Sequence, residues 1–124
     1  MVVKMVSVNE NEKSFKITRC KGFHITFPNG LTLSTQFGYG NYCENEYNED
    51  YENENIIKFV IEHKTLTIVE SNTVEIAIWD KNGKWKTREM AKEVFNKDIE
   101  DNVMGWVTID KWIKIFEWCK NYRR

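Results

Sequence analysis

The sequence predicts an α+β fold: an antiparallel β-sheet of about six to eight strands followed by two C-terminal helices. Over roughly the first eighty residues, apolar and polar side chains alternate with the period of two that is typical of strands. Over roughly the last forty, apolar side chains recur at helical spacing instead. A length of 124 residues fits a single domain over 1–124, because two separate cores would each be very small.

Alternating segments bounded by turn residues predict the individual strands. The expected strands cover residues 14–20, 22–27, 31–37, 56–62, 65–70, 73–79 and 84–87. The loop Pro28–Gly30 is expected to contain three residues, with Gly30 in a left-handed conformation. This length pairs Phe27 with Leu31 and keeps the apolar residues of both strands on one face, whereas a two-residue turn would put the faces out of step.

Residues 44–55 interrupt the alternation with a strongly acidic segment. Six of these residues are acidic, four are Asn and two are Tyr, and none is basic. Such a segment buries too little apolar surface to offset the entropy lost on ordering, so we expect a mobile acidic connector. The alternative is an acidic arm that mimics nucleic acid or docks on a basic partner.

Two helices are expected near the C-terminus. Thr87 is a candidate N-cap for a short helix that reaches about Asn96, and Thr108 is a candidate N-cap for a longer helix over 109–121. The longer helix has one apolar flank formed by Ile109, Trp112, Ile113, Phe116 and Cys119, and a second formed by Ile115, Trp118 and Tyr122. Two apolar flanks exceed what one small sheet can cover, so we expect contact with a second subunit in a homodimer or higher homo-oligomer.

Composition and charge exclude several classes of protein. A formal net charge of -1 disfavours a general nucleic-acid binder, which needs a basic surface to release counterions. No apolar run reaches the roughly 18 residues of a membrane span, and the N-terminus lacks the apolar core of a secretory signal. We therefore expect no nucleic-acid partner, no membrane partner and a cytoplasmic location.

The cysteines and histidines do not form a recognisable catalytic or metal-binding motif. Cys20, Cys43 and Cys119 are widely separated and include no CxxC pair, a pattern typical of reduced thiols in an intracellular protein. A nucleophilic cysteine needs a neighbouring base, and the sequence offers His24 and His63 without a local signature. We therefore expect no catalytic residue, metal or cofactor, and a binding protein rather than an enzyme.

One group of candidate binding residues lies in the glycine-rich segment after the third expected strand. Phe37, Tyr39 and Tyr42 supply rings, and Asn41 supplies a polar group beside them. The two glycines at 38 and 40 free the backbone to cradle an anion, although a tight bend between strand and connector explains them equally.

A second group surrounds the hairpin expected after residue 79. A three-residue loop, Lys81–Gly83, would place Trp79 opposite Trp85. Flat rings beside Asp80 and Arg88 suit a stacked nucleobase and its polar edge. The alternative is that these rings belong to the core or to an interface.

Three motifs resemble a widespread family of small phage and prophage proteins. Residues 27–43 read FPNGLTLSTQFGYGNYC, similar to that family's pattern F-x-N-G-x-T-x-S-x-Q-F-G-x-G-N-Y-C. Residues 74–85 (VEIAIWDKNGKW) and the Gly105-Trp106 pair resemble its second and third motifs. The family looks like the first-described Thoeris anti-defence proteins. The resemblance implies a homo-oligomer that holds cyclic ADP-ribose isomers, made by bacterial TIR enzymes, or cyclic oligonucleotides between its subunits without cleaving them.

Residues and resemblance together predict a phage anti-defence protein that sequesters a cyclic ADP-ribose isomer or cyclic nucleotide immune signal in the cytoplasm of the infected host. The candidate ligand-binding residues are Phe37, Tyr39, Asn41, Tyr42, Trp79, Asp80, Trp85, Arg88 and Arg123. One or two cations among them are enough to pair with a diphosphate. The alternatives are a protein–protein inhibitor of a host defence nuclease that acts through 44–55, and a thiol-dependent hydrolase that uses Cys43.

Overall fold

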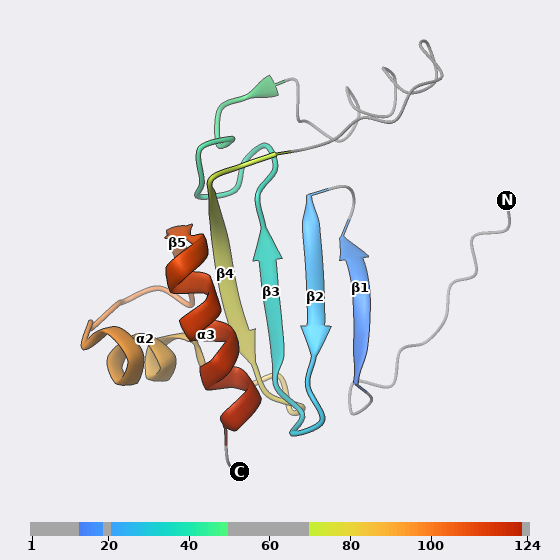
Figure 1. Ribbon diagram of the computed structural model, residues 1–124, viewed down its shortest axis with the longest axis vertical. Coiled ribbons are helices and arrows are strands. Elements are labelled where there is room, and N and C mark those ends of the chain that lie inside the picture. Colours follow the sequence, from blue (N-terminus) through green and yellow to red (C-terminus); the bar gives the residue numbers. More distant parts are fainter. Residues whose placement is uncertain (1–12, 19–20, 50–69, 123–124) are drawn as a thin grey trace, which may run out of the picture.

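The computed structural model describes residues 13–18, 21–49 and 70–122, which form an antiparallel sheet and two helices (Figure 1). The strands are β1 (Ser14–Thr18), β2 (Gly22–Thr26), β3 (Thr32–Gln36), β4 (Thr73–Trp79) and β5 (Val103–Thr108), and the helices are α2 (Thr87–Phe95) and α3 (Ile109–Asn121). The five described strands lie side by side in chain order, so β1 and β5 form the two edges of the sheet as far as it is described. Neither helix of the described part is long and apolar enough to cross a membrane.

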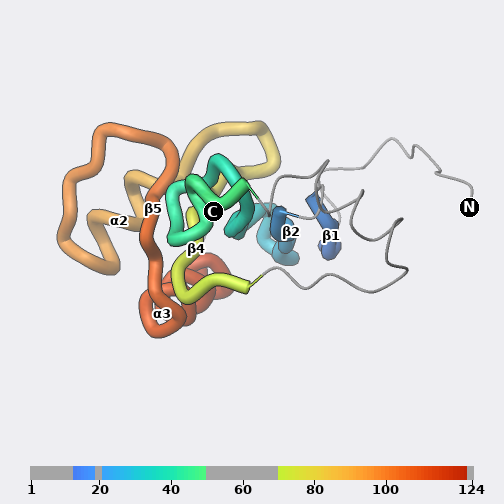
Figure 2. Tube along the Cα trace, turned by 90° about the horizontal axis from the view of Figure 1, so that it is seen from above, coloured from blue at the N-terminus to red at the C-terminus, as the bar shows by residue number. Residues whose placement is uncertain are grey.

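One face of the sheet packs against α3. Phe23, Thr35 and Ile76 are partners across β2, β3 and β4, so their side chains share a face. The indole N–H of Trp112 on α3 donates to the Thr35 hydroxyl over 2.9 Å, which identifies this face as the helix-covered one. Figure 2, which looks along the strands, shows α3 on one side of the sheet and α2 beside the β4–β5 end.

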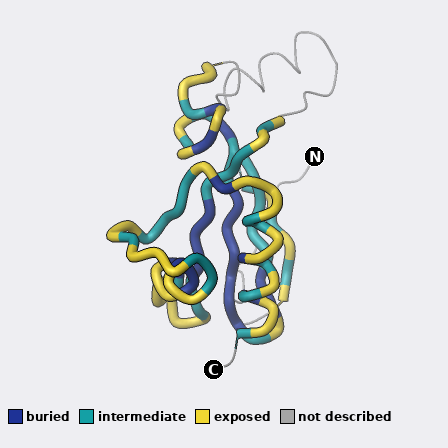
Figure 3. Tube along the Cα trace, turned by 60° about the vertical axis from the view of Figure 1, so that its left-hand side comes forward, coloured by how far each residue is buried: buried dark blue, intermediate teal, exposed yellow. Residues whose placement is uncertain are grey.

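The core lies between the central strands, β5 and the two helices. Its buried members are Phe27, Leu31, Leu33, Ile76, Ile78, Met90, Ala91, Val107, Ile115 and Cys119. Figure 3 shows the buried residues running along the central strands, with exposed residues on the outer sides of the helices. Each large aliphatic side chain contributes roughly 1.5–3 kcal/mol on burial, so this cluster decides which face α3 covers.

The predicted three-residue loop between β2 and β3 is confirmed. Ile25 is the partner of Leu33, and the backbone N–H of Phe27 donates to the Leu31 carbonyl over 2.8 Å. Gly30 has a φ of 90°, which a residue with a Cβ adopts only with strain. The phase of the apolar alternation therefore predicts both the loop length and the register.

The α+β class is confirmed, but the described residues contain five strands, fewer than the predicted six to eight. Two of the expected strands, 56–62 and 65–70, lie outside the described residues, except for Glu70, which is described and is not part of a strand. The strand expected at 84–87 is wrong, because the chain there makes an isolated bridge between Trp85 and Trp79 and then enters α2.

β5 lies between α2 and α3 and is not predicted from the sequence. Gly105 and Trp106 both stand opposite the single residue Glu75 of β4, which makes a β-bulge. The bulge breaks the period of two, so the nearly continuous apolar run 103–107 shows no strand alternation.

The helix starts are placed correctly, but the capping chemistry is not. The N-cap of α2 is Lys86, and the Thr87 hydroxyl instead accepts a hydrogen bond from the backbone N–H of Ile78 over 2.8 Å. Thr108 does occupy the N-cap position of α3, yet its side chain makes no capping hydrogen bond. The cap predicted at Thr87 is therefore wrong, and Thr108 caps α3 by position alone.

The second apolar flank of α3 faces α2 of the same chain. Ile115 is fully buried, the Trp118 indole N–H donates to Glu93, and the Tyr122 hydroxyl donates to Glu89. Both glutamates lie on α2. Within the described part of the chain, this flank of α3 therefore contacts α2.

Candidate functional site

The glycine-rich segment after β3 forms a folded loop that is held by hydrogen bonds of two asparagine side chains. Asn45 is buried, and its side-chain amide donates to the carbonyls of Phe37 and Glu70, both over 2.7 Å. The Asn41 side-chain oxygen accepts from the backbone N–H of Gly38 over 3.0 Å. These hydrogen bonds hold the backbone of Phe37 at the point where β3 ends.

Strands β4 and β5 also form hydrogen bonds with this loop. The Glu75 carboxylate on β4 accepts from the backbone N–H of Tyr42 over 2.9 Å, and Tyr42 in turn accepts from the backbone N–H of Trp106 over 2.8 Å. A Cβ at Gly105 would lie 2.5 Å from the Cβ of Tyr42, so the loop and the bulge fit only with glycine there. The first and third motifs are therefore in direct contact.

The start of the acidic segment is tied to the sheet. The backbone N–H of Glu44 donates to the Thr73 hydroxyl, and the Glu44 carboxylate accepts from the backbone N–H of Asn72. Residues 44–47 form turns, whereas 50–55 lie outside the described residues. The mobile connector thus stays a prediction for 50–55, while Glu44 and Asn45 have structural roles.

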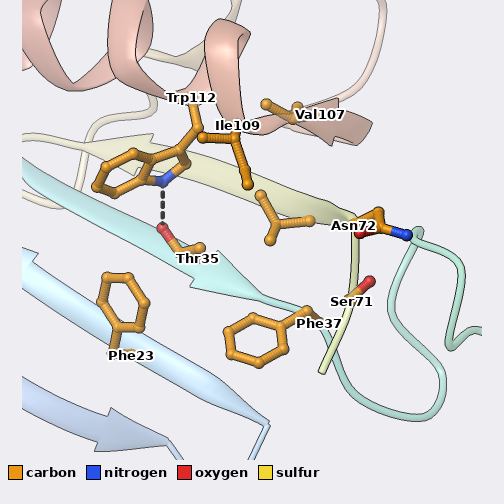
Figure 4. A pocket seen from close by; sticks show the side chains of 9 residues that line it. Phe23, Thr35, Phe37, Ser71, Asn72, Val107, Ile109 and Trp112 are labelled. Carbon is orange, nitrogen blue, oxygen red and sulfur yellow. Dashed lines mark hydrogen bonds between the residues drawn. The ribbon is translucent and has the colours of Figure 1, made fainter. Parts of the chain in front are cut away.

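Phe37 lines an apolar cavity of about 170 Å³ between the sheet and the start of α3 (Figure 4). Its lining residues are Phe23, Thr35, Phe37, Ser71, Asn72, Val74, Val107, Ile109 and Trp112. The Trp112 ring is fixed by its hydrogen bond to Thr35 and by an edge contact with Phe23, at 6.3 Å between ring centroids. Three aromatic rings from different elements therefore converge on one small space.

Ser71 and Asn72 form the polar part of the lining. The Ser71 hydroxyl donates to the Thr73 carbonyl and is thereby engaged locally. The Asn72 backbone donates to Glu44, but its side-chain amide makes no hydrogen bond within the described part of the chain. An amide offers a donor and an acceptor together, the combination that reads the edge of an adenine.

The size of the cavity limits what it can hold. A cavity of roughly 150 Å³ holds one benzene ring, whereas sites for whole drug-sized ligands span roughly 300–1,000 Å³. With about 170 Å³, this cavity suits one flat ring of a larger molecule. The rest of such a molecule would lie outside, beside the first turn of α3 that Ile109 begins.

The second group of predicted site residues forms a separate aromatic cluster. The loop Lys81–Gly83 contains three residues as predicted, and Trp79 stands opposite Trp85 with ring centroids 5.6 Å apart. Trp79 also contacts His24 edge-on at 5.1 Å. The Asp80 carboxylate accepts from two backbone N–H groups of its own turn, so it serves the hairpin.

The structure does not bring the two predicted groups together within one protomer. Gln36 pairs with Glu75 near the Phe37 end of the sheet, whereas Thr32 pairs with Trp79 at the other end. At about 3.3 Å per residue, roughly 13 Å of strand separates these levels. Arg88 lies on α2 and donates to the Ile99 carbonyl, and Arg123 lies outside the described residues.

The surroundings of the two groups considered for catalysis, Cys43 and His24, shift their pKa values. Burial raises the pKa of the Cys43 thiol above its ordinary value, which keeps it protonated. Burial, and next the charge of Lys16, lowers the pKa of His24. His24 is the partner of Ser34 on the face opposite the cavity. Among the described residues, no group of three His, Cys, Asp or Glu side chains could hold a metal ion.

Most of the cavity lining is absent from the predicted site. Trp112 and Ile109 are predicted as the apolar flank of a helix, and Phe23 as part of a strand, but their convergence depends on where α3 crosses the sheet. Asn72 carries a weak signal, since it is a polar residue in the turn before a buried strand. Phe37 is the predicted site residue that lines the cavity.

Comparison with known families, curated proteins and solved structures finds no match to this chain.

Proposed function

We propose that the protein is a phage anti-defence sponge that binds a cyclic ADP-ribose isomer, or a related cyclic nucleotide, and holds it without cleavage in the host cytoplasm. The observation that carries the proposal is the cavity next to Phe37. It joins aromatic rings, an available amide and a volume suited to one nucleobase.

The base enters the cavity and the remainder of the ligand stays outside. An adenine ring would stack on Phe37 or Trp112, and stacking of a base on an aromatic side chain contributes about 1–3 kcal/mol. The Asn72 amide lies at the polar part of the lining, where it can pair with the edge of the base. This arrangement favours Phe37 over Trp79 as the stacking residue.

The diphosphate lies beside the N-terminal turn of α3. Among the lining residues described there is no lysine or arginine. The backbone N–H groups of the first helical turn supply a partial positive charge there, and anions bind helix N-termini for this reason. We therefore assign the diphosphate to α3 instead of Arg88, which lies on α2.

The absence of cleavage is argued from the reactive groups that the structure describes. Cys43 is fully buried and its pKa is raised, so its thiol is a poor nucleophile. His24 lies on the other face of the sheet and makes an edge contact with Trp79. Neither group is among the cavity lining.

Mass spectrometry of released ligand tests this function. The purified protein is incubated with an extract of cells whose TIR enzyme is active, washed and denatured by heat, and the released small molecules are identified. We expect an intact cyclic ADP-ribose isomer or cyclic oligonucleotide. Release of a linear, cleaved product would overturn the non-catalytic reading. Failure to release or bind any member of either class would overturn the proposed function itself.

A further inference from the structure

Thr35 of β3 has a hydroxyl group that the described part of the chain uses only as an acceptor. The residue is 3% exposed, and its oxygen accepts a hydrogen bond from the Trp112 indole N–H over 2.9 Å. A threonine hydroxyl also carries a proton of its own, which it can donate. Among the residues that the structure describes, this proton has no acceptor.

The place for an acceptor is the cavity beside Phe37. Thr35 lines this cavity, and Figure 4 shows its side chain among the three aromatic rings that converge there. The large majority of buried polar groups in proteins have hydrogen-bond partners, so a buried donor without one requires an explanation. A ligand in the cavity that carries an acceptor supplies such a partner.

The hydrogen bond from Trp112 also orients the Thr35 hydroxyl. A lone pair of the oxygen faces the indole, so the hydroxyl proton points away from Trp112. The indole N–H is itself engaged in this bond and is not available to a ligand. The Ser71 hydroxyl donates to the Thr73 carbonyl, and Asn72 is exposed. Among the lining residues, Thr35 therefore supplies the buried donor.

We infer that Thr35 selects the ring that enters the cavity, by donating its hydroxyl proton to an acceptor atom in the plane of that ring. The inference rests on the proposed function, because it assigns a contact to the base that the cavity receives. It narrows the ligand to a heteroaromatic base with an unprotonated ring nitrogen, such as adenine with N1, N3 and N7. A ring of the same shape with a C–H group at that position leaves the hydroxyl unpaired.

Stacking on the aromatic rings does not supply this selection. Every base has a flat π-face, so stacking on Phe37 or Trp112 tolerates many different rings. A hydrogen bond in the plane of the ring depends instead on which atom occupies one position. The two contacts therefore have separate effects: the rings hold a flat group, and Thr35 distinguishes one flat group from another.

Calorimetric titration with a matched series of ligands tests this contact. The series contains a cyclic ADP-ribose isomer and three analogues, in each of which a C–H group replaces N1, N3 or N7 of the adenine. We expect at least one analogue to bind the unmodified protein about 2- to 12-fold more weakly than the parent. This factor corresponds to one net hydrogen bond of about 0.5–1.5 kcal/mol.

Thr35→Val has the shape of threonine without the hydroxyl and identifies the donor. It should bind the parent and the weakened analogue with equal affinity, because the group that distinguishes them is gone. The variant also removes the acceptor of the Trp112 N–H, but that loss weakens all four ligands alike and cancels in their ratio. Thr35→Ser keeps a hydroxyl and should keep the ratio of the unmodified protein.

Thr32→Val is the matched control. Thr32 is also a buried threonine of β3, but its hydroxyl pairs with that of Thr26 and it does not line the cavity. This variant should keep the ratio of the unmodified protein.

Equal affinity of the unmodified protein for all four ligands would overturn the inference and leave the proposed function in place. This result needs no variant, so the inference stays testable even if Thr35→Val does not fold. An unchanged ratio in Thr35→Val would also overturn it, because Thr35 would then serve only to hold Trp112. Absence of binding for the whole series would instead overturn the proposed function, and the inference with it.

Discussion

Asn45 connects two parts of the chain that together place Phe37. Its amide is buried and donates to the carbonyl of Phe37 and to that of Glu70, which precedes β4. A buried carbonyl without a partner costs far more than a hydrogen bond between exposed groups contributes. Asn45 therefore holds the backbone of Phe37, the residue of this loop that lines the cavity.

Replacing Asn45 with alanine should lower the free energy of unfolding by about 2–4 kcal/mol, because two buried carbonyls lose their donor. Urea denaturation measures this change. Asn121→Ala on the exposed end of α3 is the control and should shift the free energy by less than about 0.5 kcal/mol. Equal effects for the two variants would mean that Asn45 does not anchor the loop.

Cys119 makes the stability depend on pH in the alkaline range. Burial raises its pKa from 9.0 to about 12, so the unfolded chain loses this proton at a lower pH than the folded one. Its contribution is therefore complete below about pH 9 and is lost as the pH rises toward 12. Each pH unit within that window costs about 1.4 kcal/mol.

A Cys119→Ala variant should lack this dependence. Between pH 8 and pH 10.5 the free energy of unfolding of the unmodified protein should fall by about 2 kcal/mol more than that of the variant. Other titrating groups are the same in both proteins, so their contributions cancel in this comparison. Urea denaturation across this pH range supplies both curves. Parallel curves would show that the thiol titrates normally in the folded state.

At this scale the sequence predicts residue types better than residue partners. It singles out Phe37, Tyr39, Asn41 and Tyr42 as a group, and of these four residues Phe37 lines the cavity. The sequence does not reveal that the Asn41 side chain accepts a hydrogen bond from the backbone N–H of Gly38, or that the backbone N–H of Tyr42 donates to Glu75. These partners depend on the path of the folded loop.

Among the elements, the two threonines at helix starts differ in a way that spacing alone cannot show. Thr87 bonds across to the backbone of Ile78 and links α2 to β4, whereas Thr108 makes no capping bond. Valine has the shape of threonine without the hydroxyl, so it isolates the hydrogen bonds. The two sites form a matched pair.

Thr87→Val should therefore cost about 1–3 kcal/mol, because the backbone N–H of Ile78 loses the hydroxyl that accepts its hydrogen bond in the core. Thr108→Val should cost less than about 0.5 kcal/mol, well under the roughly 1 kcal/mol typical of a true side-chain cap. Chemical denaturation of both variants checks the contrast. A larger loss at Thr108 would restore the capping role expected from the sequence.

Element boundaries follow from local patterns when the pattern is regular. The phase of the alternation predicts the Pro28–Gly30 loop, and the helical spacing predicts the 109–121 helix. β5 is missed because a bulge at Gly105 and Trp106 removes the alternation. The position of α3 over one half of the sheet depends on packing among distant residues, so no local pattern contains it.

At the scale of the whole molecule, the predicted site residues lie at two ends of the sheet. The part of the sheet under α3 contains the core and the cavity beside Phe37. The aromatic cluster of Trp79 and Trp85 lies at the far end of β4 and does not line this cavity. The predicted residues are therefore divided into a cavity residue and a hairpin cluster.

Calorimetric titration with cyclic ADP-ribose isomers, comparing Phe37→Ala with Trp79→Ala, tests the central claim most directly. Loss of a stacking ring in the cavity should weaken binding by about 5- to 150-fold in Phe37→Ala, because stacking contributes about 1–3 kcal/mol and each 1.4 kcal/mol is a factor of ten. Trp79→Ala, with its ring at the other end of the sheet, should bind like the unmodified protein. Weakened binding in Trp79→Ala with Phe37→Ala unchanged would contradict the cavity as the ligand site.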